Sequence, residues 1–223
     1  MRAQLSINQL AVFFSGTENK RKRIIEQQKI PNKFLLPWYQ QAKAGMKRYF
    51  TDINEIGPIL KTIDLIVKKP ATEKKWTQTN KQVSIEALRR LLEMKMPSIL
   101  RNNPYEIIKP QDKTVDIYGL NIIVAPEVII KVNIEGRSVY GAIKFHISKS
   151  KPFSNEQASI TTSIIYEYVK KKVVGRDGIV IPELCFSLDV FGNGLIHAPL
   201  NTKQNIMALK PICKQVIELW DAA

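Results

Sequence analysis

The sequence predicts an α/β (α+β) fold in which a small mixed sheet is flanked by helices and preceded by a basic helical N-terminal unit. Apolar side chains recur at helical spacing through most of the first hundred residues, and they alternate with a period of two over residues 122–147. The rest of the chain then reads as helix, strand, strand and helix. This mixture of patterns is typical of a domain in which helices cover a sheet.

The first 67 residues form the predicted helical unit. Ser6 can cap its first helix, because a serine hydroxyl accepts a hydrogen bond from a backbone amide of the first turn. A linker or long loop is expected over residues 68–82, which are polar and basic and contain Pro70. The helices expected in the unit cover residues 7–14, 17–31, 37–50 and 53–67.

Residues 83–223 form the predicted α/β core. Ser84 can cap a helix over residues 85–96, and Ser154 opens a capping-box pattern at the start of a second helix. A second hairpin is expected around the turn at residues 192–194. The last helix is expected over residues 203–220, with Pro211 inside it.

The first hairpin of the core has a defined register if Glu135 and Gly136 form a two-residue turn, because residue 134 then pairs with residue 137. In that register Glu127 lies opposite Lys144 and shares a sheet face with it. The same face carries Ala142 and His146. The opposite face, which we expect to point into the core, carries Val128, Ile130, Ile143 and Phe145.

The net charge of +14 is unevenly distributed. Residues 1–100 hold 19 Lys and Arg against 8 Asp and Glu, whereas residues 101–223 hold 15 against 12. A basic footprint of this kind favours nucleic acid as the partner. Of the two nucleic acids, we expect DNA rather than RNA. An anionic membrane surface and a basic surface that serves only solubility are the alternatives.

Cationic side chains gather at two places that could contact phosphates. One is the second predicted helix, where an unbroken run is followed by a further lysine. The other is the polar segment that follows the lysine strand. Trp76, within the expected linker, is either a packing anchor or a platform for a base. The candidate nucleic-acid-binding residues are Lys20, Arg21, Lys22, Arg23, Lys29, Lys149 and Lys151.

The two cysteines, Cys185 and Cys213, lack the spacing of a zinc site and are expected to be reduced, buried thiols. No apolar run has the length of a membrane span, and the start of the chain has no signal-peptide pattern. We therefore expect a cytoplasmic protein that does not enter the membrane.

Residues 124–168 resemble the core of the PD-(D/E)XK nuclease superfamily, in its RecB-like branch. The segment VAPEV places Glu127 at the first acid of the motif, and GAIKFHISKSKPFSNEQ places Lys144 at the motif lysine. Tyr166 matches the tyrosine of the helix that follows. The resemblance implies that Glu127 and Lys144 are catalytic and that Glu127 helps to hold Mg²⁺ while the lysine steadies the attacking water.

The sequence departs from the motif at its second acid, where Ala142 cannot bind a metal. Asp189, Asp116 or Glu86 could supply a displaced acid. We therefore expect a nucleic-acid-binding pseudoenzyme that acts in defence, repair or mobile-element processes, either by itself or within a protein complex. The alternatives are an active Mg²⁺-dependent nuclease that uses Glu127 and Lys144, and a regulatory protein-interaction module.

Overall fold

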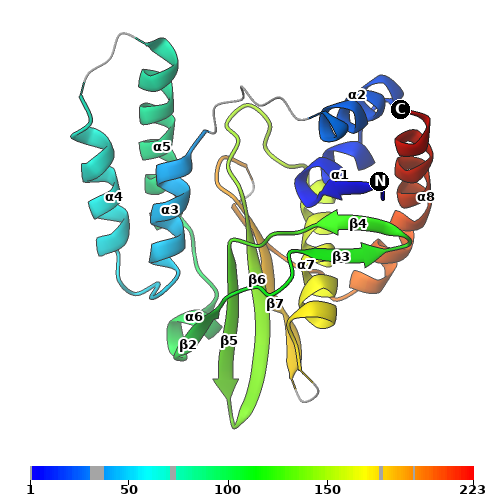
Figure 1. Ribbon diagram of the computed structural model, residues 1–223. Helices are drawn as coiled ribbons and strands as arrows, with labels where there is room; N and C mark the ends of the chain where they lie inside the picture. Colours follow the sequence, from blue (N-terminus) through cyan, green and yellow to red (C-terminus); the bar gives the residue numbers. More distant parts are fainter. Residues whose placement is uncertain (1, 31–37, 71–73, 176–177, 193) are drawn as a thin grey trace.

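A computed structural model describes residues 2–30, 38–70, 74–175, 178–192 and 194–223. A five-stranded mixed sheet of order β2-β5-β6-β7-β8 lies at the centre, and a smaller sheet of order β1-β4-β3 lies beside it (Figure 1). The strands are β1 (Gln4–Ser6), β2 (Tyr105–Ile108), β3 (Thr114–Ile117), β4 (Leu120–Ile123), β5 (Val128–Ile134), β6 (Arg137–His146), β7 (Ile179–Asp189) and β8 (Gly194–His197).

Helices cover both faces of the central sheet, which confirms the expected mixed fold (Figure 1). The helices α3, α4 and α5 lie on one side of it, and α1, α2, α7 and α8 lie on the other. The helices are α1 (Ile7–Phe14), α2 (Glu18–Lys29), α3 (Gln40–Tyr49), α4 (Gly57–Val67), α5 (Lys75–Glu93), α6 (Ser98–Asn102), α7 (Asn155–Lys172) and α8 (Thr202–Ala222).

The helices of the first 67 residues contribute to two different cores. Leu10 and Phe13 of α1 and Ile24 of α2 belong to the cluster that contains α7 and α8. In contrast, Met46 of α3 and Ile59 of α4 pack with α5 and the other face of the sheet. Within the described residues the first 67 positions hold the expected helices and also strand β1, but the apolar faces of these helices are not buried against one another as one group.

The expected linker over residues 68–82 is wrong in its second half. Helix α5 begins at Lys75, and Ser84, the expected N-cap, lies buried in the middle of that helix. Residues 71–73 lie outside the described part of the chain. The prediction failed because the early turns of α5 bury few side chains, and their sequence is therefore polar like that of a loop. A tertiary contact lies at these turns: Trp76 packs edge-on against Trp38, with ring centroids 5.3 Å apart.

The β5–β6 hairpin has the predicted register. Ile134 pairs with Arg137 and Val128 pairs with Ile143 across an antiparallel ladder. Glu135 and Gly136 have φ values of 49° and 78°, the left-handed pair that a two-residue hairpin turn requires. The ladder ends at Val128, so Glu127 lies one residue beyond its last pair.

Both faces of this hairpin are buried. Val128, Ile130, Ile143 and Phe145 pack on the α3–α5 side, as expected. The face that carries Ala142 also belongs to a core, because α7 covers it. This arrangement arises because α7 connects β6 to β7 as a parallel neighbour, and such a crossover helix packs on the sheet that it connects.

The predicted capping box is confirmed at Ser154, whose hydroxyl accepts from the backbone N–H of Gln157. The two cysteines are confirmed as buried and unbridged, and burial raises the pKa of both thiols to about 12. No helix within the described residues is long and apolar enough to cross a membrane.

Candidate functional site

Glu127 precedes β5, and its carboxylate is almost completely enclosed, with 3% of the side chain exposed. The backbone N–H of Glu127 donates to the Ile143 carbonyl at 2.9 Å. Oε2 accepts from the backbone N–H of Phe145 at 2.8 Å. Oε1 lies 2.5 Å from Nζ of Lys43 on α3 and 3.6 Å from Nζ of Lys144. Both carboxylate oxygens therefore have partners that the chain itself supplies.

Lys144 on β6 is 8% exposed, and its Nζ donates to the Ala125 carbonyl at 2.8 Å. Burial lowers the pKa of this lysine below its ordinary value. The neighbouring charges of Lys43 and Lys47 act in the same direction, whereas the charge of Glu127 opposes them. The two residues that the sequence singled out as catalytic are thus brought together, with a second lysine from α3 that the sequence did not indicate.

We expect the stability of the protein to depend on pH through Lys144. Because its folded-state pKa is lowered, the unfolded chain binds more protons than the folded one between that pKa and the ordinary value of 10.5. The free energy of unfolding therefore rises with pH in that window. Urea unfolding should show the wild type gaining stability over Lys144→Met as the pH rises through this window toward 10.5. A difference that stays constant with pH would contradict this expectation.

The residues around Glu127 do not fit Mg²⁺, which is held by carboxylate oxygens together with water. The Glu127 oxygens face two ammonium groups and a backbone amide. Ala142, at the second acid position, is completely buried against α7. In the described parts of the chain, no group of three His, Cys, Asp or Glu residues could hold a metal ion.

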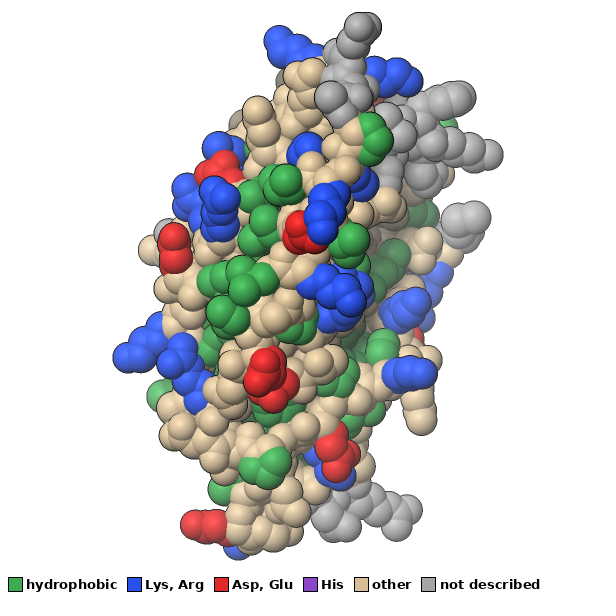
Figure 2. All heavy atoms as spheres, turned by 90° about the vertical axis from the view of Figure 1, so that its left-hand side faces the viewer, with side chains coloured by type: hydrophobic (Ala, Val, Ile, Leu, Met, Phe, Trp, Pro, Cys, Tyr) green, Lys and Arg blue, Asp and Glu red, His purple; other side chains and the backbone are tan. Residues whose placement is uncertain are grey.

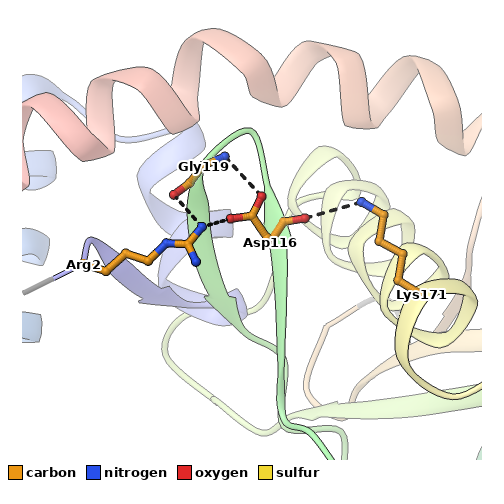
Figure 3. Close-up of polar contacts among 4 residues, drawn as sticks. All are labelled: Arg2, Asp116, Gly119 and Lys171. Carbon is orange, nitrogen blue, oxygen red and sulfur yellow. Dashed lines mark hydrogen bonds and ion pairs between the residues drawn. The ribbon is translucent and has the colours of Figure 1, made fainter.

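The three acids that could have replaced Ala142 have partners or surroundings of their own. Asp116 accepts hydrogen bonds from Arg2 and from the backbone N–H of Gly119, and its backbone carbonyl accepts from Lys171 (Figure 3). Figure 3 shows this carboxylate at the β3–β4 turn, within the smaller sheet. Asp116 therefore anchors the N-terminal segment to that turn.

Asp189 is the most deeply buried of the three acids, with no exposed surface. In the parallel β6–β7 ladder, its backbone lies directly beside that of His146. Oδ2 accepts from the backbone N–H of Phe153 at 2.7 Å, and Oδ1 has no partner among the described residues. Burial raises the pKa of this carboxyl. The ring of His146 stacks on Phe153 and its Nε2–H donates to the Lys151 carbonyl, so Asp189 and His146 secure the loop after β6.

The cationic run on α2 contains one residue with a structural role. The guanidinium of Arg21 donates to the carbonyls of Phe13 and Phe14 at 3.0 and 2.9 Å, and to Oε1 of Gln215 on α8 at 2.8 Å. These contacts satisfy carbonyls at the C-terminal end of α1, which a helix leaves without partners. Arg21 therefore joins three helices, and its charge is directed into the protein.

The other candidates on α2 are more accessible. Lys20 and Arg23 are exposed, and Lys22 pairs with an acidic residue one turn earlier at 2.8 Å. Lys29 lies over an aromatic ring of α8, 5.4 Å from its centroid. Lys20 and Arg23 are thus the side chains of this run that are best placed to reach a phosphate.

The loop after β6 carries the remaining candidates. Lys151 and Lys149 are both exposed. Nζ of Lys149 lies 2.6 Å from Oε2 of Glu86 on α5. Glu86 also accepts from Arg90 at 3.2 Å. The Glu86 carboxylate therefore pairs with two cations, Lys149 from the loop and Arg90 from α5. Glu86 was one of the three acids that could have replaced Ala142 as a metal ligand, but both of its oxygens already have cationic partners.

Aromatic residues lie next to this loop, and the sequence motifs did not indicate a functional role for them. Trp38 and Tyr39 precede α3, and Phe191 follows β7; the ring centroids of Tyr39 and Phe191 are 6.0 Å apart. The adjacent pair Trp38-Tyr39 was visible in the sequence, but its position beside Lys149 depends on contacts between distant segments.

Models of known protein families gave no match to this chain, and no curated protein matched it either.

Proposed function

We propose that this protein binds nucleic acid, DNA in preference to RNA, and does not cut it. The observation that carries the proposal is the enclosed carboxylate of Glu127. Lys43 places an ammonium group 2.5 Å from Oε1, so a positive charge of the chain occupies the position beside the carboxylate that a metal ion would need. Together with Ala142 at the second acid position, this arrangement favours binding over hydrolysis.

The arrangement of the core supports the resemblance of this site to that of RecB-like nucleases. The acid lies at the start of β5, the lysine lies on β6, and α7 follows before a parallel strand, β7. That order matches the acid, lysine strand and helix on which the resemblance rests. A fold of this kind with a blocked metal position would keep its nucleic-acid-binding surface without its chemistry.

The charge of the protein supports the binding part of the proposal. A net charge of +14 attracts a polyanion, and exposed cations lie both on α2 and on the loop after β6. Figure 2 shows that Lys and Arg side chains are also spread over the face formed by the α3–α5 side of the molecule. The proposed role is in a process such as defence, repair or the biology of mobile elements, as part of a complex or by itself.

Fluorescence anisotropy with labelled DNA at several salt concentrations tests the proposal. If about four phosphates are contacted, the logarithm of the binding constant should fall with the logarithm of salt with a slope of about −3 to −4. Incubation of the same DNA with Mg²⁺ or Mn²⁺ should leave it intact. Cleavage that is lost in Lys144→Ala would overturn the non-cutting part, and negligible binding at low salt would overturn the whole proposal.

A further inference from the structure

A groove of about 460 Å³ lies between the first half of α5 and the loop that follows β6. Its lining includes Trp38, Tyr39 and the segment Ser148-Lys149-Ser150. The groove thus combines two aromatic rings with hydroxyl groups and a cation. These groups come from distant parts of the chain, and α5 brings them together.

The aromatic wall is held in place by the surrounding structure. Trp38 is 42% exposed, but its ring is backed by Trp76 at 5.3 Å and by Tyr39 at 6.2 Å between centroids. The backbone N–H of Tyr39 donates to Oδ1 of Asn80 on α5 at 3.1 Å, and the Tyr39 ring also lies 6.0 Å from that of Phe191 between centroids. A partly exposed ring that two neighbouring rings support binds a flat partner without first losing much conformational freedom.

The cationic end of the groove is partly neutralised. Nζ of Lys149 and the guanidinium of Arg90 lie 6.0 and 5.3 Å from the centroid of Phe191, and both also pair with Glu86. Because two cations share one carboxylate, the cluster keeps a net positive charge. A phosphate could take over the contact of Lys149 with Glu86, at the cost of breaking one ion pair.

We propose that this groove binds the unpaired bases of single-stranded DNA, with a base stacked on Trp38 and a phosphate held by Lys149 and the neighbouring serine hydroxyls. The inference rests on the proposed function and specifies the form of nucleic acid. Stacking on a protein ring requires a base whose face is open, and this is available in a single strand but not inside a duplex. The cation and hydroxyl groups beside the rings match the charge of the phosphate backbone.

Anisotropy titrations with oligothymidine and with a duplex of equal length test this inference. Trp38→Ala should weaken oligothymidine binding about tenfold and leave duplex binding within about twofold, because one stacked base is lost. Lys149→Gln should weaken oligothymidine binding by a smaller factor. Glu86→Gln should strengthen oligothymidine binding, because Lys149 then no longer pairs with a carboxylate and can contact a phosphate. Tyr118→Ala is the matched control: Tyr118 is also 42% exposed, but it lies at the β3–β4 turn.

The outcomes separate the two proposals. If the wild type binds neither DNA at low salt, the proposed function fails and this inference fails with it. If the wild type binds DNA but Trp38→Ala and Lys149→Gln, checked for folding by circular dichroism, bind oligothymidine as tightly as the wild type does, only the groove is ruled out. An equal loss of single-strand and duplex binding in Trp38→Ala would also overturn the assignment to unpaired bases.

Discussion

Replacing Glu127 with glutamine should lower the free energy of unfolding by about 3 kcal/mol, because it leaves a buried lysine without its counter-charge. Lys144 is 8% exposed, and Lys43 lies 2.5 Å from the carboxylate that would be removed. Glutamine has nearly the same shape and can still accept from the backbone N–H of Phe145. The change therefore removes charge while it leaves the packing intact, and urea unfolding near neutral pH measures its effect.

Glu86→Gln is the matched control for this experiment. Glu86 also pairs with two cations, Arg90 and Lys149, but its side chain is 31% exposed. Solvent screens such pairs, so we expect a loss below about 1 kcal/mol. The double variant Glu127→Gln with Lys144→Met should recover much of the stability that Glu127→Gln loses, because it removes both buried charges together.

A result in which Glu127→Gln is neutral or stabilising would contradict this account of the cluster. It would instead favour the nuclease alternative, because functional carboxylates are often held at a cost to stability. The stability of this one variant therefore bears on the function as well as on the fold. A large loss supports a structural ion cluster in the place where the resemblance puts a metal site.

Arg21→Ala should lower the free energy of unfolding by about 2 kcal/mol, because it removes three hydrogen bonds from a charged, partly buried donor. It also removes a positive charge from the C-terminal end of α1, where cations are favourable, and a contact with the ring of Phe13 at 5.3 Å. Thermal or urea unfolding measures this loss.

Arg23→Ala is the control, since Arg23 belongs to the same cationic run and is exposed. We expect it to change stability by less than about 0.5 kcal/mol and to weaken DNA binding if α2 contacts phosphates. Under conditions in which both variants are folded, Arg21→Ala should weaken DNA binding less than Arg23→Ala does. The reverse order would show that the Arg21 side chain leaves its carbonyl partners to bind DNA.

Local patterns predicted several elements correctly. The hairpin register follows from Glu135 and Gly136, because a two-residue turn leaves one way to pair the strands that flank it. Helix α7 begins at its predicted capping box, and α1 begins after its predicted N-cap, Ser6. Each of these features depends on residues that are close together in the chain, which is why the sequence reveals them.

Other elements depend on partners that are distant in the chain. Strand β1 pairs in parallel with β4, more than a hundred residues later, and nothing in its three residues indicates that pairing. The first turns of α5 have a polar sequence that is typical of a loop, and they are helical where Trp76 packs against Trp38. Tertiary contacts override local propensity at such places.

The candidate site divides in the same way. By itself the sequence determined the mixed fold, the pairing that brings Glu127 close to Lys144, the alanine at the second acid position and the excess of positive charge, because each is a matter of local pattern or composition. Only the tertiary structure decided that Lys43 faces Glu127, that Arg21 is directed inward while Arg23 is exposed, and that Trp38 lies beside Lys149. The physical reason is that burial and charge pairing depend on distances between segments, and those distances arise only when the helices pack on the sheet.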